Sequence, residues 1–252
     1  MAFGAIVQGP VSQASLIQVV GSGTAVTATF DSAVTAGNLI VVVHFTGATD
    51  SQAYAGMTEA VAVTDGTNAD QGAIYFRVVQ GGDGTTWGAN SGGADEHGML
   101  MWEIEGPFAA SPLDVTAVNA GNPVTDPGTS FSTGTTATTA QNDEVAFAIV
   151  TSRNVFVDVS AWSNSFTGTL KAGMANKVVV GGFKVLTATG TVETTATLTL
   201  GTGGGCMAGI ATFKKAGAGG IPETGVEGME ISDSVSYSVV LSPSTCRIVS
   251  TL

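Results

Sequence analysis

The stretch TAVTATF at residues 24–30 is followed, after a short polar segment, by LIVVVHF at residues 39–45. In the first stretch Val26, Ala28 and Phe30 alternate with polar or small residues, and a period of two is typical of a strand with one buried face. The second stretch is apolar at nearly every position, which is typical of a strand buried on both faces. The pair predicts a half-exposed strand followed by a buried one.

The same patterns recur along the chain, separated by turns that use many of its 35 glycines. One segment, residues 53–63, instead places Tyr54, Met57 and Val61 at helical spacing and favours a short helix. Further strands are predicted at residues 74–79, 99–105, 145–150, 155–159, 178–186, 194–200 and 207–214. The sequence therefore predicts an all-β fold, a jelly-roll-like antiparallel β-sandwich with a C-terminal hairpin.

A weak internal repeat divides the predicted sandwich, residues 1–215, into two halves at about 16–121 and 129–215. The triplet Phe76-Arg77-Val78 resembles Phe183-Lys184-Val185, and in both halves a Gly-Thr turn follows. Between the halves, residues 122–139 form a polar connection rich in threonine. This order is compatible with one sandwich, which we favour, or with two tandem modules.

The composition changes at residues 216–228, where glycine, alanine and a proline predict a flexible linker. Residues 229–252 then alternate apolar and polar side chains, which predicts a hairpin with one apolar face. An isolated hairpin is barely stable, so we expect this face to bind a partner, with packing on the chain's own sandwich as the alternative. The predicted partner-binding residues are Met229, Ile231, Val235, Tyr237, Val239, Leu241, Ile248 and Leu252.

Composition excludes some functions. The formal charge of −12, with only eight lysines and arginines, argues against nucleic-acid binding, because phosphate contacts need clustered cations. No apolar run is long enough for a membrane span, and the first ten residues lack a signal-peptide pattern, so we expect no membrane association and synthesis in a host cytoplasm. Cys206 and Cys246 are interpreted as buried thiols, with a disulfide as the alternative.

Few residues could carry chemistry. His44 is expected to be a satisfied residue at a sheet edge, and the residues beside His97 point apart, which disfavours a metal site there. Glu103 and Glu105 share a strand face and are expected to accept hydrogen bonds rather than to cleave glycosides. Residues 65–70 lack the last ligand of a calcium loop and are interpreted as a solvated turn. We predict no catalytic residue, metal or cofactor.

Several stretches resemble a class of phage and prophage virion proteins with a jelly-roll or concanavalin-like β-sandwich. They are Ala36–Val42, Ile74–Phe76, Trp102–Gly106 followed by Pro112–Asp114, and Ala208–Lys214. The resemblance covers the chain up to residue 215 and implies a structural role in the particle rather than an activity. The C-terminal hairpin has no counterpart in it.

We therefore expect a non-enzymatic virion protein, a capsid decoration or head-accessory protein. Its expected partners are other proteins of the capsid or tail lattice and further copies of itself. We expect the hairpin, together with residues 3–7, to extend a neighbour's sheet or to fill its groove. The alternative is a carbohydrate-binding module of a tail or fibre, in which Trp87 or Trp162 stacks on host-surface glycans.

Overall fold

The computed structural model describes residues 3–8, 18–47, 51–53, 56–64, 71–119, 130–152, 156–168, 171–174, 177–200, 206–217, 237–242 and 245–250. Within these ranges every regular element is a β-strand, and no helix there could cross a membrane. The chain divides into two compact units, Met1–Ala216 and Gly217–Leu252.

The first half of the larger unit builds one antiparallel sheet. Its strands are β1 (Ile6–Gln8), β2 (Gln18–Thr29), β3 (Leu39–Thr46), β4 (Ser51–Ala53), β5 (Thr58–Thr64), β6 (Gln71–Val78) and β7 (Thr86–Ile104). The spatial order is β1-β7-β3-β6-β5, and the long strand β7 also pairs with β2 and β4. Every residue of β3 is buried, as its apolar sequence predicts, because layers cover both faces of the sheet.

The second half builds two sheets. Their strands are β8 (Phe108–Asn119), β9 (Ser130–Ser132), β10 (Glu144–Ser152), β11 (Phe156–Trp162), β12 (Lys171–Met174), β13 (Lys177–Leu186), β14 (Thr195–Leu200) and β15 (Cys206–Lys215). The larger sheet has the order β12-β13-β10-β15-β8, and the smaller has the order β11-β14-β9. The fully buried β10 lies centrally in the larger sheet, as β3 does in the first half.

The main core lies between the two larger sheets. Trp102 of β7 contacts Phe147 of β10 with ring centroids 5.5 Å apart, and Phe76 of β6 contacts Phe213 of β15 at 5.2 Å. The sheets approach closely beside Trp102, whose ring would lie 2.5 Å from a Cβ atom added to Gly181. The predicted all-β sandwich is therefore confirmed.

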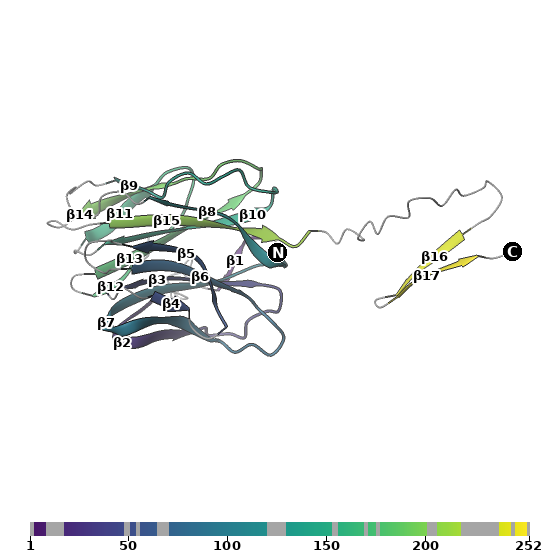
Figure 1. The fold of residues 1–252 in the computed structure, drawn as a ribbon, viewed down its shortest axis with the longest axis horizontal. Coiled ribbons are helices and arrows are strands. Elements are labelled where there is room, and N and C mark those ends of the chain that lie inside the picture. The colour runs from purple at the N-terminus through teal and green to yellow at the C-terminus, as the bar shows by residue number, and fades with distance from the viewer. Residues whose placement is uncertain are drawn as a thin grey trace. The chain divides into compact units, whose positions relative to one another are not determined.

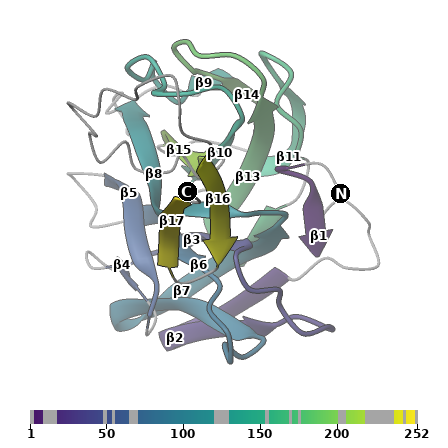
Figure 2. The same ribbon diagram turned by 90° about the vertical axis from the view of Figure 1, so that its right-hand side faces the viewer.

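Two outer layers cover the backs of these sheets. On the first sheet, Val26 of β2, Phe30 just after it and Trp87 of β7 pack over Val42 and Met101. The smaller sheet of the second half covers the other side, where β11 and β14 pack against β10 and β13. Figure 1 shows β2 below and β9, β11 and β14 above the central strands, and Figure 2 shows the same stacking end-on.

Both halves of the large unit have the same strand order. The sequence β7-β3-β6-β5 in the first sheet corresponds to β15-β10-β13-β12 in the second, and β2-β7-β4 corresponds to β9-β14-β11. The long strand β7 therefore makes the pairings that are divided between β14 and β15 in the second half. Strand β8 lies within the predicted first half, residues 16–121, but pairs with β15, so the boundary between the two like halves falls between β7 and β8 rather than after residue 121. A jelly-roll strand order is not established by this arrangement.

The described residues 56–63 do not form the predicted helix, and Tyr54 lies outside the described residues. Strand β5 begins at Thr58 and pairs with β6, with a bulge between Glu59 and Val61. Met57 and Val61, expected on one helical face, lie in different cores on opposite sides of the sheet. The bulge explains the error, because an extra residue breaks the period of two that identifies a strand.

The N-terminal segment pairs within its own chain. Strand β1 lies beside β7, and Phe3 contacts Phe108 of the main core with ring centroids 4.9 Å apart. Within the chain these residues pair with β7 on one side only, since β1 ends the strand order, and their expected contact with a neighbour stays a prediction.

The second unit contains the predicted hairpin, formed by β16 (Tyr237–Ser242) and β17 (Thr245–Ser250). The register pairs Val239 with Ile248, Leu241 with Cys246 and Tyr237 with Ser250, so these positions alternate along the ladder with Ser238 and its partner Val249. The remaining predicted partner-binding residues, Met229, Ile231, Val235 and Leu252, lie outside the described residues.

Candidate functional site

The two histidines form a buried pair. His44 lies on β3, between β6 and β7, so its expected position at a sheet edge is wrong. Its Nε2 lies 3.3 Å from Nδ1 of His97, and both residues are buried. Burial, followed by the charge of His97, lowers the pKa of His44 to about 3. This ring is neutral at physiological pH and inaccessible to a substrate. Among the described residues no group of three or more metal-ligating side chains gathers.

Glu103 is fully buried and accepts three short hydrogen bonds. The donors are Gln8 Nε2 at 2.6 Å, the Thr35 N–H at 2.8 Å and Asn38 Nδ2 at 2.7 Å. The prediction that Glu103 accepts hydrogen bonds is confirmed, although two of its donors are amides rather than hydroxyls. Glu105, just beyond β7, is half-buried. Glu103 therefore joins β1, β7 and the segment before β3.

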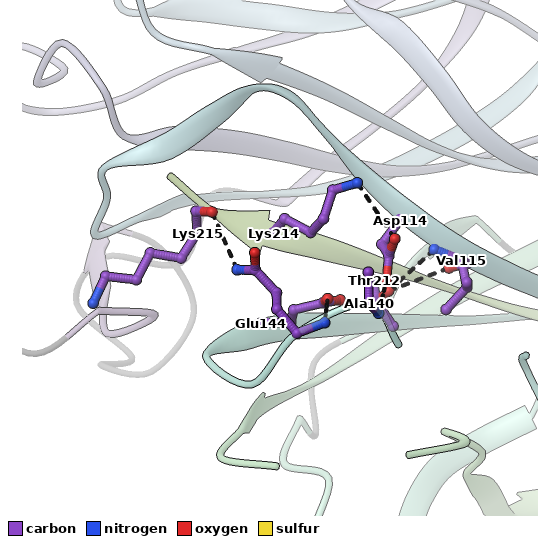
Figure 3. A network of polar contacts seen from close by, with 8 residues as sticks. Asp114, Val115, Ala140, Glu144, Thr212, Lys214 and Lys215 are labelled. Atoms are coloured by element: carbon purple, nitrogen blue, oxygen red, sulfur yellow. Dashed lines mark hydrogen bonds and ion pairs between the residues drawn. The ribbon is translucent and has the colours of Figure 1, made fainter. Parts of the chain in front are cut away.

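A second acidic cluster lies where β8, β10 and β15 meet (Figure 3). Asp114 of β8 accepts the Ala140 N–H at 2.6 Å and the Lys214 ammonium at 3.3 Å. Glu144, the first residue of β10, is buried beside Asp114 and Thr212 and accepts the Gln141 N–H at 3.3 Å.

The two carboxyl groups of this cluster titrate differently. Burial is the main cause that raises the pKa of Glu144 to about 7, and the nearby charge of Asp114 adds to it. Burial also opposes ionisation of Asp114, but the Ala140 N–H, Glu144 and Lys214 outweigh it and lower the pKa of Asp114. The cluster therefore holds a proton on Glu144 near neutral pH.

Neither of the two tryptophans predicted to stack on sugars has a fully exposed ring. Trp87 is only 5% exposed, packs in the outer core of the first half and has the Arg77 guanidinium 5.5 Å from its ring centre. The stacking prediction for Trp87 is therefore wrong. Trp162 is half-buried, packs against the outer cores of the second half, and donates its indole N–H to the Gly168 carbonyl.

A polar hollow of about 560 Å³ opens on the second half. Leu186 and Val192, both buried, line it together with polar residues. The polar lining comes from the segment after β9, the turn after β11, the end of β13 and the β13–β14 loop: Thr135, Asn164, Ser165, Lys184, Thr187, Thr189, Thr191 and Glu193. The volume lies in the range of small-molecule sites.

Thr135 belongs to the segment at residues 133–139, and three buried threonines attach this segment to the β13–β14 loop that lines the hollow. Thr133, Thr136 and Thr139 each donate the backbone N–H to a carbonyl of that loop, at 2.9, 3.0 and 3.0 Å. Each hydroxyl oxygen then accepts the N–H of the same loop residue, at 3.1, 2.9 and 3.1 Å. We call this arrangement the threonine ladder. Its partners are Thr194, Val192 and Gly190.

The sequence pointed to few of these residues. The ladder has a signal, a period of three in Thr133, Thr136 and Thr139, within a stretch that was interpreted only as a polar connection. Glu144 and its neighbour Asp114 carry no such signal, because strands far apart in the chain bring them together. The loop at residues 65–70 lies outside the described residues.

Cys206 is a buried free thiol, as predicted. Burial raises its pKa to about 11, so it is no nucleophile at neutral pH.

Comparison with known proteins gives no relative. No protein-family model, no curated protein and no solved structure matches the chain.

Proposed function

We propose that this chain is a non-enzymatic structural protein of a phage particle, a capsid decoration or head-accessory protein that joins neighbouring subunits through its C-terminal hairpin. The observation that carries the proposal is the division of the chain into a large β unit with its own cores and a second unit whose described residues form one hairpin.

The energetic reason is the small size of the hairpin. Two strands alone bury too little apolar surface to be stable in water. A hairpin becomes stable when a third strand pairs with it or when another layer packs against its apolar face. The register places Val239 opposite Ile248 and Leu241 opposite Cys246, so apolar positions repeat along one alternation of the ladder. Docking these positions onto a neighbouring subunit supplies the missing surface.

The remainder of the large unit supports a structural role. Glu103 is enclosed by its donors, and the His44 and His97 pair is buried. The titratable groups of both sites thus serve folding rather than a reaction. The resemblance of residues 1–215 to phage virion proteins points the same way.

The test compares the full chain with a chain that ends at Ala216. We expect the shortened chain to keep cooperative thermal unfolding, because its cores are intact, but to stay monomeric by light scattering and to be lost from purified particles. Equal oligomerisation and equal incorporation into particles would reject the proposal.

Point variants in the full chain make the test specific. Leu241→Glu should abolish assembly, whereas Ser238→Glu, on the other alternation of the same strand, should leave assembly intact. Equal behaviour of the two variants would contradict docking through the apolar alternation.

A further inference from the structure

The hollow beside the threonine ladder has a counterpart in the first half, and that counterpart is closed. Arg77 of β6 corresponds to Lys184 of β13, since each follows the phenylalanine that pairs with the central strand of its sheet. Arg77 donates to both oxygens of Asp83, at 3.0 and 2.7 Å, and to the Gly56 carbonyl at 3.0 Å. Its guanidinium thereby fastens the β6–β7 loop.

Lys184 lines the open hollow instead. Within the part of the chain that the structure describes, its ammonium forms no ion pair. The β13–β14 loop is held by the threonine ladder instead of by Lys184, which lines the hollow. The same strand order thus carries a β6–β7 loop bound by Arg77 in the first half and a β13–β14 loop that lines an open hollow in the second.

The lining of the hollow indicates the chemistry of its ligand. Thr187, Thr189 and Thr191 are exposed at alternate positions of the loop and present hydroxyls and methyl groups side by side. Asn164 adds an amide, and Glu193 adds a carboxylate that accepts the Thr135 hydroxyl at 2.5 Å. Hydroxyls, an amide, one ammonium and one carboxylate match the alternating hydroxyl and C–H groups of a sugar ring.

The hollow is also preorganised. The threonine ladder fixes one wall through six hydrogen bonds. The turn that carries Asn164 and Ser165 holds both residues at positive φ, 55° and 61°, and is closed by the Phe166 N–H to the Ser163 carbonyl at 3.2 Å. Asn164 Nδ2 donates to the Glu193 carbonyl at 3.0 Å and joins this turn to the loop. A rigid frame lowers the entropic cost of ordering a binding site.

We propose that this hollow is a saccharide-binding site, in which the threonine hydroxyls, Asn164 and Lys184 bind sugar hydroxyls over the apolar residues Leu186 and Val192. The site goes beyond the assembly role and is independent of the C-terminal hairpin. It requires neither Trp87 nor Trp162 as a stacking platform.

The test is binding of the full chain to an array of neutral and carboxylate-bearing oligosaccharides, followed by titration calorimetry with the best-bound sugar. Ala188 lies in the loop and is exposed, so Ala188→Trp should fill the hollow without disturbing a core and weaken binding at least about tenfold. Lys184→Ala should weaken binding several-fold by removing donors.

The matched control is Gly81→Trp in the corresponding loop of the first half, where an added Cβ meets no atom within 4 Å. This variant should bind the sugar as the unaltered chain does, and thermal unfolding should show that both tryptophan variants are folded. The proposal is overturned if no oligosaccharide binds, if Ala188→Trp binds normally, or if Gly81→Trp weakens binding equally.

Discussion

The two halves of the large unit place a buried polar pair at the same point of the same strand order. The groups that surround the pair differ between the halves. Val41 pairs with Phe76 and Trp102, and Phe147 pairs with Phe183 and Ala211. By these registers, Asn38 and Glu103 of the first half correspond to Glu144 and Thr212 of the second.

In the first half the carboxylate is on the strand β7, and three N–H donors surround it. In the second half the carboxyl group is on β10, beside a second carboxylate, Asp114, and it carries a proton near neutral pH. The difference teaches that strand order fixes where a buried polar pair lies, whereas the neighbouring residues decide how many donors its carboxyl group finds.

The largest expected effect tests the donor-rich site. Glu103→Ala should lower the free energy of unfolding by about 3 kcal/mol, because it removes a fully buried side chain that accepts from Gln8, Thr35 and Asn38, and leaves the buried Asn38 amide without this acceptor. The control is Glu105→Ala, beyond the end of the same strand and half-buried, which should cost less than about 1 kcal/mol. Urea unfolding measures both, and equal losses would show that the donors are not what matters.

The buried histidine of the first half should make stability fall in acid. The pKa of His44 is lower in the folded chain than the unfolded value of 6.5, so its contribution is present above pH 6.5 and is lost as the pH falls. Between pH 6.5 and 4.5 this loss amounts to about 2 kcal/mol. His44→Gln should be less stable at neutral pH but should lose less over that interval. A loss as steep as in the unaltered chain would refute the buried neutral ring.

The acid cluster of the second half should act in the opposite direction. The pKa of Glu144, about 7 in the folded chain, exceeds its usual value of 4.5, so its contribution is complete below pH 4.5 and is lost as the pH rises through 7. Allowing for partial screening, Glu144→Gln should be more stable than the unaltered chain at pH 8 by about 2 kcal/mol. Chemical unfolding at pH 5 and pH 8 checks this, and equal differences at both values would contradict it.

The smallest effect concerns the threonine ladder. Thr136→Val removes the oxygen that accepts the Val192 N–H and should cost about 1.5 kcal/mol. Thr138→Val, two residues later on the exposed side of the same segment, should cost almost nothing. A thermal shift of the same size in both variants would mean that the ladder contributes no stability.

Much of this fold follows from local pattern. Continuous apolar runs identify β3 and β10 because a central strand with both faces covered has no polar position. The internal repeat between Phe76 and Phe183 indicated two like halves, and their strand pairings do repeat. The helix at residues 53–63 failed because a bulge disguises a strand.

The sites were harder to predict because their members are far apart in the chain. Gln8 and Glu103 are joined across 95 positions, and Thr35 contributes only its backbone, which no residue type can signal. The stacking role considered for Trp87 also required an exposed ring, whereas this ring is buried in the outer core of the first half. What could have been found is the threonine period of three, since burial at every third residue differs from both strand and helix.

The most direct measurement of the assembly proposal is amide hydrogen exchange of residues 237–242 and 245–250, in the dilute monomer and in assembled particles. If a neighbouring subunit stabilises the hairpin, its amides exchange rapidly in the monomer and become strongly protected in the particle, while those of β3 and β10 are protected in both. Equal protection of the hairpin in the dilute monomer and in the particle would contradict assembly through the C-terminal unit.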